Sequence, residues 1–136
     1  VQGGAADMEV EMNVYGIGTV HELFLYPTQA DRNAAIGEGC AVEIGKAYEY
    51  GLYSPEDVID YNKRVSGTNN KTYTFSSGGV EWLAYDFTIS NKNLSCASAM
   101  IDGECYLVAC MFNDSNQDTV VSLYNQAIAS VRAWSG

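Results

Sequence analysis

The four cysteines and the one histidine are the side chains here whose types suit nucleophilic or redox chemistry. Cys40, Cys96, Cys105 and Cys110 are spaced so that no two form the C-x-x-C pair typical of zinc and dithiol redox sites. An even number of cysteines permits disulfides if the chain is exported, because oxidising compartments let them persist. The alternative is simple core packing, since cysteine is among the most buried residue types.

A hairpin signal limits which cysteines can pair with one another. Asp102-Gly103 is typical of a two-residue turn between antiparallel strands. Pairing about this turn places three pairs of residues opposite each other: Met100 with Cys105, Cys96 with Ala109, and Ser95 with Cys110. No two of these cysteines are direct partners, so we predict at most one disulfide, between Cys40 and one of Cys96, Cys105 and Cys110.

His21 is the one candidate for a general base beside a cysteine nucleophile. No cysteine lies in a recognisable nucleophile signature, and neither G-x-S-x-G nor a phosphate-binding glycine loop occurs. Asp114, Asn116 and Asp118 alternate like the start of a calcium loop, but the positions that need glycine and glutamate hold other residues. We therefore expect no catalytic residue, no metal site and no cofactor, with a cysteine-dependent hydrolase as an alternative.

Three aromatic residues are candidates for binding a ligand. Trp82 lies on a predicted strand over residues 80–89, on the face opposite Leu83 and Tyr85, where it would form a platform unless a helix covers it. Tyr48 and Tyr50 stand two apart on a predicted strand over residues 40–50 and would share a face suited to stacking on a sugar or a peptide. A helix is the competing interpretation for residues 40–50.

The elements that must position these residues begin with a hairpin. Residues 8–14 alternate strictly between apolar and polar, which is typical of a half-buried strand, and residues 20–26 resume an extended pattern that Pro27 ends. Residues 1–7 are expected to be a disordered N-terminal tail. Ser54, Pro55 and Asp57 then mark the start of a helix that ends near residues 67–70.

Four strands and a helix complete the pattern. The strands are predicted over residues 72–76, 80–89, 94–101 and 104–112, and apolar residues at helical spacing from 120 to 131 predict the helix. The strand over 104–112 is apolar on both faces, as a central strand covered on both sides is. The sequence thus predicts one α+β domain over residues 1–136, an antiparallel sheet of about six to seven strands between two helices, in the order βββ-α-ββββ-α.

Composition restricts the partners of the chain. Seven Lys and Arg face seventeen Asp and Glu, which gives a net charge of −10 and disfavours nucleic acid, because phosphate contacts need clustered positive charge. No apolar run approaches the ~18 residues that would span a bilayer. The charge serves either solubility or the attraction of a basic partner.

The order of elements resembles the Mog1/PsbP-like group of domains, an α/β/α sandwich found in small exported bacterial lipoproteins. The resemblance covers most of the chain from residue 8 to residue 132. Its motifs are Tyr26-Pro27, Gly78-Gly79-Val80, Asp102-Gly103 and Ile128-Ala129-Ser130-Val131. It implies a binding or accessory protein without shared catalytic residues.

This resemblance leads us to expect a non-enzymatic binding or accessory domain of an exported bacterial protein that acts on a protein or a small ligand. A signal or lipid anchor removed ahead of residue 1 would fit that expectation and an extracytoplasmic location. The alternative is an intracellular acidic protein in the cytoplasm that binds or neutralises a basic protein partner.

Overall fold

The computed structural model describes residues 6–14, 18–26 and 41–135. Within them, seven antiparallel strands form one sheet in the order β1-β2-β3-β7-β6-β5-β4. The elements are β1 (Ala6–Val14), β2 (Gly18–Tyr26), β3 (Ala41–Lys46), the 3-10 helix η1 (Ala47–Tyr50), α2 (Pro55–Ser66), β4 (Tyr73–Ser77), β5 (Val80–Ile89), β6 (Lys92–Ile101), β7 (Glu104–Phe112) and α3 (Gln117–Ser135).

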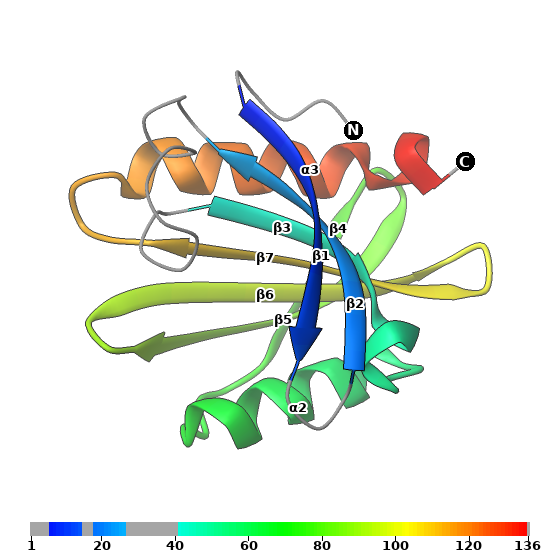
Figure 1. Cartoon of the computed structure of the whole chain (residues 1–136), viewed down its shortest axis with the longest axis horizontal. Coiled ribbons are helices and arrows are strands. Elements are labelled where there is room, and N and C mark those ends of the chain that lie inside the picture. Colours follow the sequence, from blue (N-terminus) through cyan, green and yellow to red (C-terminus); the bar gives the residue numbers. More distant parts are fainter. Residues whose placement is uncertain (1–5, 15–17, 27–40, 136) are drawn as a thin grey trace.

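The sheet is built from two meanders, one of β1, β2 and β3 and the other of β4, β5, β6 and β7, which join where β3 pairs with β7. Strong twist turns β1 and β2 across the direction of β6 and β7 (Figure 1). Helix α3 packs on β7 and β3, whereas α2 packs on β5, β6 and β7 from the other face. The predicted α+β class, element order and α/β/α layers are confirmed.

Helix α2 begins and ends where the sequence predicts. The Ser54 side chain accepts a hydrogen bond from the Asp57 N–H at 3.1 Å, and Pro55 is the first helical residue. Gly67 ends the helix in the left-handed region, at φ 69°, with its N–H donating to the Lys63 carbonyl.

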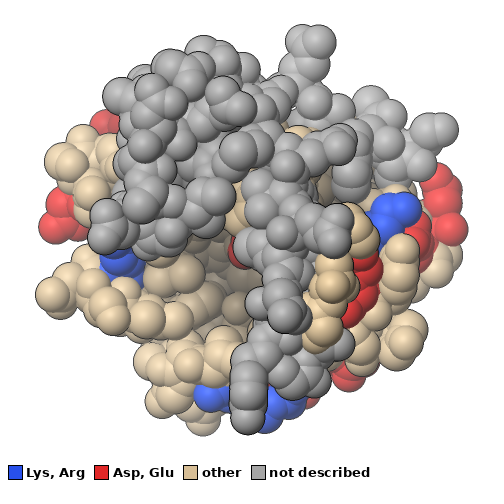
Figure 2. Space-filling model, in the orientation of Figure 1, with Lys and Arg blue, Asp and Glu red and all other residues tan. Residues whose placement is uncertain are grey.

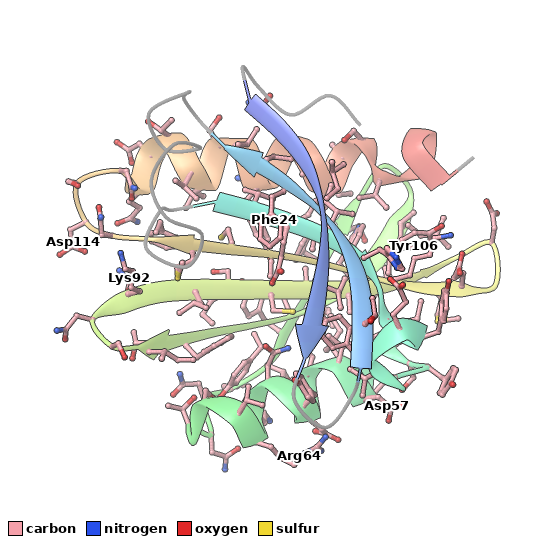
Figure 3. The ribbon with its side chains drawn as sticks, in the orientation of Figure 1. Phe24, Asp57, Arg64, Lys92, Tyr106 and Asp114 are labelled. Carbon is pink, nitrogen blue, oxygen red and sulfur yellow. The ribbon has the colours of Figure 1, made fainter. Side chains whose placement is uncertain are left out.

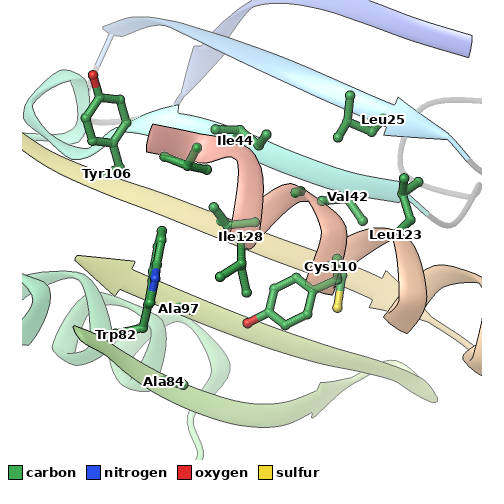
Figure 4. Packing of buried hydrophobic residues seen from close by; sticks show 14 of the residues in the cluster. Leu25, Val42, Ile44, Trp82, Ala84, Ala97, Tyr106, Cys110, Leu123 and Ile128 are labelled. Atoms are coloured by element: carbon green, nitrogen blue, oxygen red, sulfur yellow. The ribbon is translucent and has the colours of Figure 1, made fainter. Parts of the chain in front are cut away.

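The core on the α3 face consists of the predicted apolar stripe of the helix and the residues beneath it. Leu123 and Ile128 project from α3 toward the sheet, where Val42, Trp82 and Cys110 lie (Figure 4). The buried residues of the stripe are Val120, Leu123, Tyr124, Ala127, Ile128 and Val131. Every residue predicted for this stripe is therefore in the core.

A second core fills the space beneath α2 and η1. Strand β5 alternates as predicted, because Trp82 and Ala84 belong to the core on the α3 face while Tyr85 and Phe87 belong to this one. The buried members of this second core are Ala47, Leu52, Val58, Ile59, Tyr85, Phe87, Cys96, Cys105 and Leu107. Strand β7 contributes to both cores, which confirms that both of its faces are covered.

Two boundaries differ from the sequence-based expectation. The predicted strand over residues 40–50 stops at Lys46, because residues 47–50 form η1, which Gly51 ends at φ 73°. Ala6 and Asp7, expected in the tail, instead pair with Tyr26 and Leu25. Residues 1–5 of that tail lie outside the described residues.

Candidate binding pocket

One row of residues crosses five strands on the α2 face of the sheet. Phe24 of β2 is opposite Glu43 of β3, which is opposite Ala109 of β7. Ala109 is in turn opposite Cys96 of β6, and Cys96 is opposite Tyr85 of β5. Directly opposed residues point to the same side of a sheet, so the five side chains form one continuous line.

Ala109 is the smallest side chain of this row, and a cavity lies there beneath α2. The cavity has a volume of about 70 Å³. Its lining residues define what we call the Glu43 pocket: Glu43, Tyr50, Leu52, Val58, Tyr61, Asn62, Cys96, Leu107 and Ala109. Figure 2 shows a hollow above α2, and the described residues that border it there are mostly uncharged.

Glu43 brings a carboxyl group into a pocket whose walls are mostly apolar. Its neighbours Val42 and Ile44 are buried on the opposite face, toward α3. Within the described part of the chain, the Glu43 carboxyl makes no hydrogen bond and no ion pair. Burial raises the pKa of Glu43 from 4.5 to about 7, because the ionised form is poorly solvated there. The Glu43 carboxyl therefore titrates near neutral pH.

Helix α2 and η1 supply the other polar groups of the pocket. The Asn62 side-chain N–H donates to the Val58 carbonyl at 2.8 Å and to the Cys96 sulfur at 3.4 Å, which fixes its orientation. The rings of Tyr50 and Tyr61 lie 6.0 Å apart, tilted by 56°. Arg64 stacks on Tyr61, and Figure 3 shows it on the outer side of α2, away from the sheet.

The structure separates the three aromatic residues proposed as a binding surface. Trp82 is 1% exposed and belongs to the core beneath α3, so a platform at Trp82 is wrong, and the covering helix is the correct interpretation. Tyr48 is 50% exposed but lies on η1, so it does not share a strand face with Tyr50. Tyr50 lines the Glu43 pocket and alone of the three belongs to a candidate site.

The predicted register of the β6–β7 hairpin is confirmed, with Cys96 opposite Ala109 and Cys105 opposite Met100. Cys96, Cys105 and Cys110 are all buried. Cys40 lies outside the described residues, so its disulfide with one of these three stays a prediction. Burial raises the pKa of Cys110 to about 12 and also raises that of Cys105.

These thiols are expected to be unreactive in the native protein. Alkylation of Cys105 and Cys110 by iodoacetamide at pH 8 should be at least ~100-fold slower than in the urea-unfolded chain, because both are buried and protonated. Peptide mapping by mass spectrometry measures each site separately. Native labelling as fast as that of the unfolded chain would favour the cysteine-dependent hydrolase instead.

His21 and the turn that precedes α3 have structural partners. The His21 ring Nδ1 lies 2.6 Å from Glu49 Oε1, and the His21 backbone N–H donates to the other oxygen, which ties β2 to η1. The Asn113 side chain accepts hydrogen bonds from the N–H groups of Ser115 and Asn116 in the turn before α3. In the ranges that the structure covers, no three His, Cys, Asp or Glu side chains are grouped to hold a metal.

The sequence interpretation missed Glu43, Asn62 and Ala109. In isolation, Glu43 between two apolar residues looks like the solvent side of an alternating strand. The apolar residues on both faces of β7 indicate a central strand, whose neighbours can also be partly covered. The sequence does not report that β3 is one of these neighbours, so it could not place Glu43 beneath a helix.

The fold is an α/β/α sandwich, and a small pocket with one carboxyl group lies beneath one of its helices. Among solved structures, the chain resembles the solution structure of cyanobacterial PsbP (CyanoP) from Synechocystis sp. PCC 6803 with a TM-score of 0.51. Sequence identity is 12%, over 93% of this chain and 80% of CyanoP, so the likeness shows the fold alone. No family model and no curated protein sequence matches the chain.

No helix among the described residues is long and apolar enough to cross a membrane.

Proposed function

We propose that this chain is a non-enzymatic binding or accessory domain of an exported bacterial protein and that its ligand enters the Glu43 pocket. The observation that carries the proposal is a carboxyl group at an open cavity with no partner in the described part of the chain. The PsbP-like fold is compatible with an accessory role.

Such a pocket costs the folded state free energy, which favours a functional reason for it. Glu43 must either give up hydration or keep a proton at neutral pH, and its raised pKa reflects that cost. The cavity over Ala109 also forgoes the packing that a larger side chain would supply. Titratable groups with shifted pKa values inside pockets are concentrated at functional sites.

A substitution that fills the pocket tests the proposal. Ala109→Val adds two methyl groups to the row between Glu43 and Cys96, whereas Ala129→Val adds the same groups on the exposed side of α3. Native mass spectrometry of protein produced in its source organism should show an added ligand mass on the wild type and on Ala129→Val, but not on Ala109→Val. A bare wild-type mass, or the same added mass on Ala109→Val, would contradict the proposal.

Export is proposed on the sequence resemblance to the Mog1/PsbP-like group alone and is tested separately. The intact mass of the native-source protein, with and without reduction and alkylation, gives its processed N-terminus and its number of free thiols together. A processed or lipidated terminus with one disulfide fits export. An unprocessed terminus with four free thiols places the protein in the cytoplasm.

The net charge of −10 supports a second candidate, an intracellular acidic protein that binds a basic protein partner. Association driven by that charge would weaken steeply with added salt, because ions screen the attraction between the two surfaces. Binding to a partner that is insensitive to salt between low and physiological ionic strength would exclude this candidate.

A further inference from the structure

We propose that the Glu43 pocket binds an alkylammonium group, which is the chemistry shared by a lysine side chain and a small primary amine. This inference rests on the proposed binding function and names its ligand class. Three features of the pocket lead to it: a carboxyl without a paired cation among the described residues, an acceptor beside aromatic rings, and a small size.

The carboxyl of Glu43 needs a cation that the described part of the chain does not supply. Lys63 on α2 lies over the Tyr85 ring at 5.5 Å, and Arg64 lies over the Tyr61 ring at 5.9 Å. Lys46, the nearest lysine along β3, pairs with Glu104 at 3.5 Å. A partly buried carboxylate is stabilised by a paired cation. A cationic ligand would supply the positive charge that Lys46, Lys63 and Arg64 do not bring to Glu43.

Asn62 supplies a hydrogen-bond acceptor in the same pocket as Glu43, as an ammonium group requires. Asn62 uses its N–H donor on Val58 and Cys96, which leaves its carbonyl oxygen as an acceptor at the pocket. An ammonium group has three donors and no acceptor, so it matches this carbonyl together with the Glu43 carboxylate. The ring of Tyr50, which also lines the pocket, attracts cations through its π face, whereas the ring of Tyr61 already holds Arg64.

The size of the pocket selects a terminal group rather than a whole ligand. Its volume of about 70 Å³ is well below the ~300–1,000 Å³ of pockets that enclose drug-sized molecules. Leu52, Val58 and Leu107 supply apolar walls. Methylene groups behind an ammonium can pack against such walls while the charge reaches Glu43, as lysine stems do elsewhere.

A titration with n-butylammonium, followed by ¹⁵N–¹H NMR at pH 8, tests the inference. Saturable shifts should appear at the amides of Asn62, Leu107 and Ala109, and neutral n-butanol and anionic butyrate should not produce them. Glu43→Gln keeps the shape of the side chain and should weaken butylammonium binding by at least ~10-fold, because it removes the paired charge. Glu104→Gln removes a carboxylate outside the pocket and should change the affinity by less than about two-fold.

The outcomes separate the ligand class from the site. Saturable pocket shifts with n-butanol or butyrate but not with butylammonium would overturn the ammonium class and leave the pocket as a binding site. Absence of shifts with all three would overturn the inference, whereas the native-source mass measurement tests the binding function independently. Equal affinities of wild type and Glu43→Gln would also overturn it. N-acetyl-lysine methylamide then distinguishes the sources: its binding supports a lysine of a protein partner, and binding of butylammonium alone supports a small amine.

Discussion

Replacing Trp82 with alanine is expected to lower the free energy of unfolding by about 3–5 kcal/mol, the range typical of a large aromatic residue removed from a core. Trp82 is 1% exposed and lies beneath α3, between the neighbouring strands β4 and β6. Its ring nitrogen has no hydrogen-bond partner in the described part of the chain, so the loss comes from packing rather than from a broken hydrogen bond. Urea unfolding measures the change directly.

Tyr48→Ala is the matched control for Trp82→Ala, because Tyr48 is an aromatic residue that is 50% exposed. Its cost should stay within about 0.5 kcal/mol, as for other exposed substitutions. If Trp82→Ala also lowered the free energy of unfolding by less than about 1 kcal/mol at an unchanged denaturant slope, the core position of Trp82 would be wrong. Trp82 would then again be a candidate for a binding platform on the surface.

Glu43→Gln is expected to remove a pH dependence of stability between pH 4.5 and about 8. In the unfolded chain Glu43 has its ordinary pKa of 4.5, and burial raises the folded value to about 7. Between these values the folded state keeps a proton that the unfolded state has released, so the stability of the wild type falls as pH rises. The difference between the two pKa values corresponds to at most roughly 3 kcal/mol, and the loss is complete about one pH unit above the folded pKa.

Glutamine cannot titrate, so the variant should gain stability relative to the wild type as pH rises. Urea unfolding of both proteins at pH 5 and at pH 8 measures this, since carboxyl groups far from Glu43 contribute equally to both and cancel in the difference. A wild-type-minus-variant difference that is the same at both pH values would show that Glu43 is well solvated in the folded protein.

Much of the fold follows from local signals in the sequence. The Ser54 cap, Pro55 and Gly67 each act within one or two turns of chain, so the bounds of α2 could be predicted from them. Asp102-Gly103 fixes a tight turn, and the period of two then sets the whole β6–β7 register, including Cys96 opposite Ala109. Strong alternation placed Trp82 and Tyr85 on opposite faces of β5 for the same reason.

The features that could not be predicted depend on tertiary contacts. Tyr48 and Tyr50 alternate as in a strand, but η1 forms there, with Glu49 bound by His21 from a strand 28 residues earlier. The Glu43 pocket needs β3, β7, β6 and α2 to assemble, and no local pattern reports which residue of β3 lies opposite Ala109. Periodicity identifies faces within a strand but not the pairing of distant strands.

The single seam between the two meanders affects how the molecule can open. Residues 41–46 pair with residues 106–111, and this ladder is the only strand pairing between the two halves of the described sheet. Partial opening along it would separate Glu43 from Ala109 and abolish the pocket while leaving each meander internally paired. A ligand bound in the Glu43 pocket would contact both halves and stabilise the closed sheet. Ligand binding should therefore slow amide hydrogen exchange along β3 and β7 more than along the β5–β6 hairpin.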